Sequence, residues 1–445
     1  MACSSLILAS GLGNFQRIFV CPSCSRRTFQ YSRRFVAVDG TFLKGRFTLT
    51  LLVAVGIDAN GNNVLLAWAI VESENKSSWE YFFHHLRIAI PEISSEICVL
   101  VSDRDKGLAE ADSVLGPNVI RGYCCKHIES NIRDKFSAKE GLLKLFWEAA
   151  RARSEATFDY RMQKIRDVNP RAYEYISSID PRTWATAHFP VARFGHLTSN
   201  VAESVNKVVR EDRGLPVTDL LNELWHRVMN DRYDRLEEAR RQQRQGAVVT
   251  PLCATVISRD RKWATANSVQ RSSPTEARVM QPDGVVYLVN LGTRSCGCGR
   301  FQENGIPCGH AMSLIFNVRQ TLDGYIQEEM TITRWVEMYS DPLPPIDISG
   351  LRPQERIVDE EWVDDDGHDA FREREPVGCN PPATRVPRGR PRKVRMDKGQ
   401  YRASRGATAA ELGENGVGVP ERRGGHCRTC GEVGHNTRTC RRPHQ

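Results

Sequence analysis

The stretch FVAVDGTF, residues 35–42, joins a run of apolar residues to an acid. Its apolar half is typical of a strand buried on both faces, because such strands lack the polar alternation of a half-exposed strand. A second run of this kind, ICVLVSD at 97–103, also ends in an aspartate. Asp39 and Asp103 therefore stand at the ends of two predicted core strands, where parallel neighbours would bring them to one edge of a sheet.

The sequence between these runs predicts a hairpin and a helix. Residues 47–58 and 63–72 are apolar stretches joined by the turn Ala-Asn-Gly-Asn, and WEYFFHHLRIAI follows as a helix. Beyond Asp103, KGLAEADSVL is typical of a helix and residues 118–124 of a further strand. Three antiparallel strands followed by parallel strands with helical crossovers predict an α/β fold with a ribonuclease H-like mixed sheet.

A third acid, Glu203, lies in HLTSNVAESVNKVV, residues 196–209, which predicts a helix. Three carboxylates from two strand ends and a helix can hold two Mg²⁺ or Mn²⁺ ions. Such a pair activates a water or sugar hydroxyl and stabilises the leaving oxygen of a phosphodiester. Other acids compete for the third position: Glu129, Glu211 and Asp212.

The long interval between Asp103 and Glu203 indicates an insertion, since residues 126–195 are amphipathic and mostly helical. A charged helix is predicted from about 217 to 245, and short strands are predicted over 252–290. The expected organisation is a lead-in at 1–34, a core at 35–135, a helical insertion at 136–195, a helix pair at 196–245, a zinc region at 250–340, a disordered linker at 341–424 and a small zinc module at 425–442.

Two clusters of cysteine and histidine have zinc-type spacings. In SCGCGRFQENGIPCGHAMSL a turn-rich loop separates two tight pairs, and the four candidate ligands are Cys296, Cys298, Cys308 and His310. Zinc prefers four such ligands in a tetrahedron, so a closed structural site is expected. The alternative is a small hairpin that simply buries these residues.

The second cluster, CRTCGEVGHNTRTC at 427–440, has zinc-knuckle spacing. Its ligands are Cys427, Cys430, His435 and Cys440. This second structural zinc predicts binding of single-stranded nucleic acid. Because Val433 and Thr437 are modest stacking residues, a protein partner is the alternative.

A basic segment, VPRGRPRKVR at 386–395, resembles an AT-hook core. Its candidate DNA contacts are Arg388, Arg390, Arg392 and Lys393. An extended Arg-Gly-Arg segment fits the narrow minor groove of A·T-rich DNA. A nuclear-import signal or a plain basic linker explains it equally well.

Three further residues are ambiguous. Cys124 and His127 are spaced as half of a metal site, although a buried cysteine beside a helix-start histidine is the simpler interpretation. Trp184 could stack on a displaced base, but a core tryptophan is the commoner outcome.

Composition favours an intracellular, nucleic-acid-binding protein. Formal net charge is +8, with basic and acidic blocks segregated along the chain. Six of the fourteen cysteines fall, with two histidines, into the two zinc-type patterns, and no convincing signal peptide or membrane span is present. We expect a reducing compartment, the nucleus, with a mitochondrial transit peptide at the acid-free start as the weaker alternative.

Taken together, these motifs resemble Mutator-like element transposases, the group that includes the domesticated far-red-response transcription factors of plants. VAVDGTFLKG, VLVSDRDKGL, YCCKHIESN and HLTSNVAESVNK carry the resemblance, and CxC…CxH follows as a SWIM-type zinc finger. The resemblance implies an Asp-Asp-Glu transposase that acts on transposon ends and target DNA, with a second copy of the chain as a further expected partner. It also implies that Glu203 is the third acid.

One departure stands out. Relatives carry a DNA-binding domain well before the first aspartate, whereas 38 residues precede Asp39 here. We therefore expect a truncated copy with weak, salt-sensitive DNA binding. The alternative to a transposase is a non-catalytic DNA-binding regulator on the same scaffold.

Overall fold

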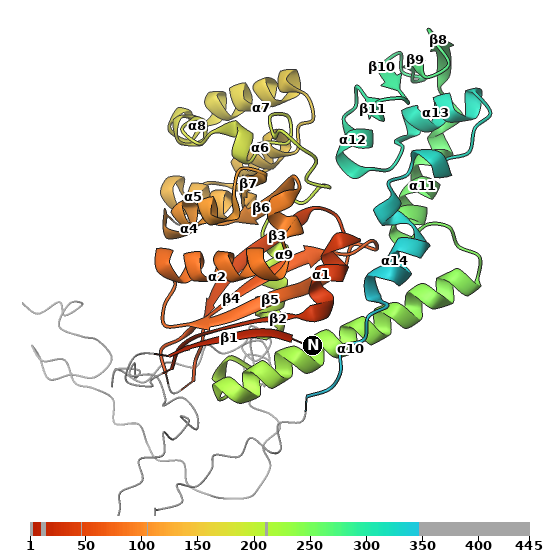
Figure 1. Cartoon of the computed structure of the whole chain (residues 1–445). Helices are drawn as coiled ribbons and strands as arrows, with labels where there is room; N and C mark the ends of the chain where they lie inside the picture. Colours follow the sequence, from red (N-terminus) through yellow and green to blue (C-terminus); the bar gives the residue numbers. More distant parts are fainter. Residues whose placement is uncertain (1–2, 10–14, 46, 105, 210–211, 347–445) are drawn as a thin grey trace, which may run out of the picture. The chain divides into compact units, whose positions relative to one another are not determined.

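A mixed sheet forms the centre of the molecule (Figure 1). The computed structural model describes residues 3–9, 15–45, 47–104, 106–209 and 212–346. In spatial order the strands of the sheet are β1 (Cys3–Ala9), β2 (Phe15–Pro22), β5 (Asn63–Val71), β4 (Thr50–Ile57), β3 (Phe35–Phe42), β6 (Cys98–Ser102) and β7 (Val119–Tyr123).

The sheet is antiparallel on one side of β3 and parallel on the other. β3 pairs antiparallel with β4, and β4 with β5, whereas β3, β6 and β7 run parallel. The predicted hairpin, the strand that leads into Asp103 and the strand at 118–124 are present. Asp39 was expected at a strand end, but β3 continues past it to Phe42 because residues 40–42 still pair with β4. The mixed α/β fold predicted from the apolar runs is confirmed.

Helices cover both faces of this sheet, which explains why its central strands are apolar throughout. Val36 and Val38 of β3 belong to one core, with α2 (Lys76–Ala89) and α14 (Ile332–Tyr339). Phe35 and Ala37 point to the other face. That face is covered by α9 (Asn200–Val208) and α10 (Val217–Arg244).

The N-terminal segment takes part in this core, which the sequence did not predict. β2 pairs with β5 through Ile18, Phe19 and Val20, and so extends the sheet beyond the predicted hairpin. The helix α1 (Ser23–Gln30) then buries Cys24 and Phe29. Residues 15–30 are therefore part of the folded core in addition to leading into β3.

The predicted helical insertion is present and has a core of its own. Its helices are α5 (Cys125–Phe136), α6 (Glu140–Ala150), α7 (Glu155–Val168) and α8 (Pro170–Ser177). Trp184 is fully buried there and stacks on Phe146 with ring centroids 5.3 Å apart. It is a core tryptophan, so the base-stacking role considered for it is wrong for this conformation.

The zinc region begins with a helix, which corrects the prediction of strands from 252. Thr250 accepts a hydrogen bond from Cys253 N, and Pro251 occupies the first turn of α11 (Pro251–Ala264). A capping threonine and an early proline outweigh the β-branched residues that follow. The remaining elements are β8 (Ser268–Arg271), β9 (Glu276–Met280), β10 (Val286–Asn290), β11 (Ser295–Cys296), α12 (Arg300–Asn304) and α13 (Gly309–Asn317).

After the zinc region the chain returns to the sheet. Thr331 forms a bridge with Val249, so both ends of the region meet. Trp335 and Tyr339 of α14 then donate hydrogen bonds of 3.2 and 3.0 Å to the buried carboxylate of Asp58, which follows β4. The last described helix thus closes the core begun by the first strands.

Short helices complete the described chain. They are α3 (Glu92–Ser95), α4 (Lys106–Ala111) and 3₁₀ turns at Asp112–Leu115, Pro181–Thr183, Asp212–Gly214, Asp323–Tyr325 and Glu328–Met330. Within these described ranges no helix is both long and apolar enough to cross a membrane. The acidic linker, the Arg-Gly-Arg segment and the zinc-knuckle pattern lie outside the described residues.

Candidate metal centres and nucleic-acid interface

Asp39 lies on β3, on the face covered by α9. In an alternating strand it shares the side of Phe35 and Ala37, and α9 contacts both β3 and β4. Asn206 of α9 donates a hydrogen bond of 2.7 Å to Asp39 Oδ2. Burial, together with the charge of Glu203, raises the pKa of Asp39 to about 6, although the hydrogen bond from Asn206 acts to lower it.

Asp103 follows β6 and reaches the same edge of the sheet. The last pair of the parallel ladder joins Ala37 to Val101, and Asp39 and Asp103 each follow two residues later along the chain. Asp103 lines an open pocket of about 740 Å³, together with His127, Arg104 and residues of the helical insertion. Both acids thus belong to neighbouring parallel strands or their continuation, and their joint binding of metal stays a prediction.

Glu203 lies in the first turn of α9. Ser199 Oγ donates a hydrogen bond of 3.1 Å to Glu203 Oε1, and the Cys124 sulfur lies 4.0 Å from the same oxygen. Of the rival acids, Asp212 pairs with Arg227, while Glu129 is buried between Lys126 and Arg133. The third rival, Glu211, lies outside the described residues.

Cys124 and His127 lie beside Glu203, at the junction of β7 and α5. The ligand atoms of the three side chains are within 4.8 Å of one another. Burial raises the pKa of the Cys124 thiol, but contacts with His127 and Ser199 outweigh it and lower the pKa. The neighbouring Cys124 raises the pKa of His127 to about 9 against the effect of burial, with further contributions from Glu203 and Asp103.

The acidic centre is therefore assembled in two overlapping parts. Among the described residues, Cys124, His127 and Glu203 form a group with ligand atoms within 4.8 Å, whereas the three carboxylates do not form such a group. Electrostatic interactions still connect them, because Glu203 acts on Asp39 and Asp103 acts on His127. The partnership of Glu203 with Cys124 was not predicted from the sequence.

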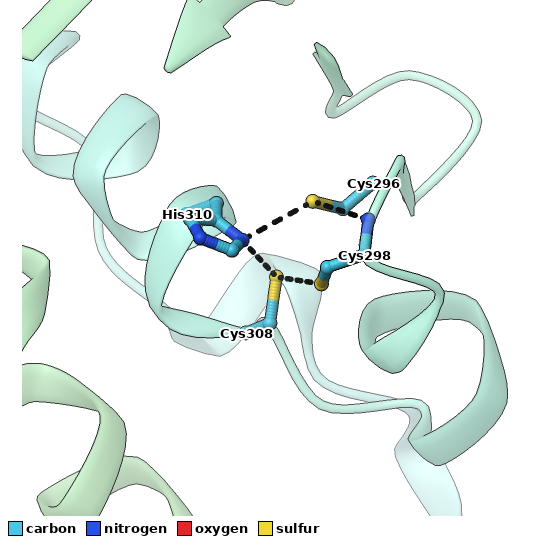
Figure 2. Close-up of side chains that lie close together, drawn as sticks. All are labelled: Cys296, Cys298, Cys308 and His310. Carbon is cyan, nitrogen blue, oxygen red and sulfur yellow. Dashed lines mark hydrogen bonds between the residues drawn. The ribbon is translucent and has the colours of Figure 1, made fainter. Parts of the chain in front are cut away.

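The zinc-type cluster of the second region is compact. Cys296 Sγ lies 3.6 Å from His310 Nδ1, and Cys298 Sγ lies 3.5 Å from Cys308 Sγ (Figure 2). All four ligand atoms are within 4.8 Å of one another. Contact among the three thiols lowers the pKa of Cys298 and raises the pKa of Cys296 and of Cys308, so the cluster favours one thiolate in the absence of a cation. The four residues are well arranged for tetrahedral zinc.

Two family models match the chain in these places. Residues 35–131 match the MULE transposase domain, and residues 287–318 match the SWIM zinc finger. The resemblance to MULE transposases is confirmed. The first match contains Asp39, Asp103, Cys124 and His127, and it ends within α5, before Glu203. The second contains all four residues of the compact cluster, which we therefore call the SWIM site.

A curated relative points the same way. Protein FAR1-RELATED SEQUENCE 6 of Arabidopsis thaliana is 22% identical over 123 residues, which cover 28% of this chain. The match spans only 17% of the length of that relative. The chain thus contains regions similar to the MULE transposase domain and the SWIM zinc finger, with a distant similarity to a FAR1-related protein.

A basic pocket lies between the helical insertion and the SWIM zinc finger. Its volume is about 590 Å³, and its arginines are Arg151, Arg153, Arg161 and Arg300. Arg161 pairs with Glu148, and Arg300 with Asp260. Trp263 and Tyr287 add aromatic surface, with Tyr287 stacked on His310 at 4.0 Å between ring centroids. Positive charge combined with partly exposed aromatic rings suits nucleic acid.

Proposed function

We propose that this transposase-derived chain cleaves DNA and transfers its strands by metal-dependent chemistry at Asp39, Asp103 and Glu203. The observation that carries the proposal is the register of β3 and β6. It makes β3 and β6 parallel neighbours, so that Asp39 and Asp103 come from adjacent strands, and α9, which carries Glu203, packs on β3. This arrangement joins the three acids that the resemblance to MULE transposases implies.

The topology supports a ribonuclease H-like core. In the order β5-β4-β3-β6-β7, three antiparallel strands are followed by two parallel strands. Helices cover both faces, as that type of sheet requires. The helical insertion falls between the last strand and the helix of Glu203.

The acidic donors fit hard divalent ions. Burial and the charge of Glu203 both disfavour ionisation of Asp39, so the centre concentrates negative charge that a cation would neutralise. Carboxylate oxygens are the donors that Mg²⁺ prefers in proteins. When bound, a metal pair supplies activation of water or a 3′ hydroxyl and stabilises the leaving oxygen.

The chain's own residues hold and orient these acids. Asn206 fixes one oxygen of Asp39 by its 2.7 Å hydrogen bond, and Ser199 fixes one oxygen of Glu203. The 740 Å³ pocket beside Asp103 admits a phosphodiester to the same edge. Such preorganisation limits the reorganisation needed when substrate binds.

DNA is the partner that the surface supports best. Arg151 and Arg153 lie in the connection between α6 and α7, in the basic pocket shared with the SWIM zinc finger. The Arg-Gly-Arg segment and the zinc knuckle would extend this contact. We further propose that the protein acts in the nucleus as a homo-oligomer on transposon ends. Imaging of a tagged chain and its mass in solution test these two points.

A nicking assay tests the catalytic proposal. Wild-type protein with Mn²⁺ should convert supercoiled plasmid to the nicked form, and Mn²⁺ omission should abolish the reaction. The variant Glu203→Gln should fail while retaining its helical content and its zinc-dependent stability in the SWIM region. Nicking by this variant at the wild-type rate would contradict the assignment of Glu203.

A non-catalytic regulator is the second candidate function. The similarity to a FAR1-related protein favours it. The far-red-response group that the sequence resembles consists of domesticated transcription factors, and such a regulator does not need to cleave DNA. Such a protein would bind DNA through the same basic pocket and show no metal-dependent nicking. The plasmid assay therefore separates the two candidates.

A further inference from the structure

We propose that Cys124, His127 and Glu203 bind one Zn²⁺ at the side of the acidic centre, with a fourth coordination position left open. The site goes beyond strand cleavage, because zinc binding at these residues does not depend on the cleavage activity. The three ligand atoms already lie within 4.8 Å of one another. The Cys124 sulfur is 4.0 Å from Glu203 Oε1.

The backbone presents these ligands on a rigid frame. Cys124 N donates a hydrogen bond of 2.8 Å to Ser102 O, the last residue of β6. Ser199 N donates to the Cys124 sulfur at 3.2 Å, just before α9 begins. Cys124 is completely buried, and His127 follows it on the first turn of α5. Two strands and two helices thus meet at the three side chains.

The donor chemistry selects zinc over magnesium. A thiolate, an imidazole and a carboxylate are the ligands zinc takes in three-ligand sites, whereas Mg²⁺ prefers oxygen alone. With bond lengths of 2.0–2.3 Å, neighbouring ligands in a zinc tetrahedron stand about 3.3–3.8 Å apart. The observed separations therefore close by small side-chain rotations.

One polar atom at the site lacks a partner. His127 Nδ1 is buried and has no hydrogen-bond partner in the described part of the chain. A buried ring nitrogen without a partner is costly, and a metal ion or a water held by that ion would satisfy it. This orphaned atom lies on a side chain that also lines the open pocket beside Asp103.

The site differs from the SWIM site in its number of protein ligands. Four protein ligands close the SWIM cluster, whereas three protein ligands leave a position for water or substrate. Zinc would occupy one oxygen of Glu203 and leave the other for a hard ion. This last consequence alone rests on the proposed cleavage function.

Zinc counting on the full-length protein tests the site. Wild-type protein and the variants Cys124→Ser and His127→Asn are purified from zinc-replete medium, and zinc per chain is measured by mass spectrometry. Each variant should lose about one zinc per chain relative to wild type. The matched control Cys98→Ser changes a buried cysteine at the far end of β6 and should keep the wild-type count.

Two further comparisons keep the result decisive. Asp103→Asn removes an acid of the proposed cleavage site and none of the three zinc ligands, so its zinc count should equal that of wild type even if nicking is lost. If Cys124→Ser does not fold, His127→Asn decides, because the histidine is only partly buried. Equal zinc counts in wild type and folded His127→Asn would overturn the proposal.

Discussion

The SWIM site and the acidic centre assemble in opposite ways. The four SWIM ligands lie within residues 296–310, on a two-residue strand, a turn and one helix start. The acidic centre draws on β3, the ends of β6 and β7, and α9, between Asp39 and Glu203. The first can form from local chain geometry, whereas the second exists only after the sheet and the helical insertion have folded.

This difference also divides stability from function. A closed thiolate and imidazole set releases folding energy when zinc binds. The surroundings of Asp39 disfavour its charged form, so the charged Asp39 lowers the free energy of unfolding of the metal-free protein.

The largest effect is expected from Cys308→Ser. Binding of structural zinc is worth about 10–16 kcal/mol in zinc-finger peptides, so loss of a SWIM ligand should unfold that region. Limited proteolysis should then cut within residues 251–330, while the sheet core stays resistant because it has separate hydrophobic clusters. Cys253→Ser, a buried cysteine of the same region, is the control and should keep its zinc.

Asp103→Asn should lower the rate of plasmid nicking by more than about 100-fold. Substitution of a residue that only supports a metal ligand already lowers metal affinity or activity by about 10–100-fold, and Asp103 is itself a proposed ligand. Thermal unfolding should change little, since the residue follows a strand at the rim of an open pocket. The matched control is Asp180→Asn, which lines the same pocket from the helical insertion. Equal loss of nicking in both variants would mean that pocket charge, not the sheet edge, governs the reaction.

Asp39→Asn should stabilise the metal-free protein by about 3 kcal/mol at pH 8. The folded-state pKa of about 6 exceeds the ordinary aspartate value of 3.8, so the folded state binds more protons between these values. Stability from this group is therefore present below pH 3.8 and is lost as pH rises through 6. Thermal unfolding in magnesium-free buffer measures the gain, which should vanish at low pH.

The exposed substitution Asp159→Asn controls for a simple change of charge, and should shift stability by less than about 0.5 kcal/mol. A wild-type protein more stable than Asp39→Asn at pH 8 without metal would show that Asp39 is not strained in the empty site. Magnesium should reverse the order, because it binds only the carboxylate form.

The smallest effect concerns the basic pocket. The double variant Arg151→Glu and Arg153→Glu should weaken DNA binding about tenfold at moderate salt. The number of counterions released on binding, obtained from the salt dependence of the affinity, should fall by roughly two. Fluorescence anisotropy at several salt concentrations measures both quantities. Arg244→Glu, an exposed arginine at the end of α10, should leave them nearly unchanged.

Much of the sheet could be predicted, because central strands buried on both faces are continuous apolar runs. The SWIM ligands followed from spacing alone. In contrast, β2 and α1 lie in a short segment without the long apolar run of the central strands, and only their packing against β5 and α14 gives them structure. The apolar stretch FQRIFVCP was the available signal for β2.

The missed contacts of the site are those that depend on topology. No spacing rule links Cys124 to Glu203, which are joined by the fold of the insertion between them. The same holds for Glu303 of the SWIM region, whose carboxylate accepts hydrogen bonds from the backbone N–H groups of Arg193 and Gly195. Phe194 between them has a φ of 55°, a strained conformation that this buried acceptor helps to hold.

The late return of α14 to the sheet has a consequence for biosynthesis. The last core strand ends at Tyr123, yet Trp335 and Tyr339 are needed to satisfy Asp58 and cover one face of the core. At 5–20 residues per second, roughly 10–40 s separate these two points during translation. Throughout that interval the nascent sheet exposes an apolar face, and we expect chaperones to bind it until the helix emerges.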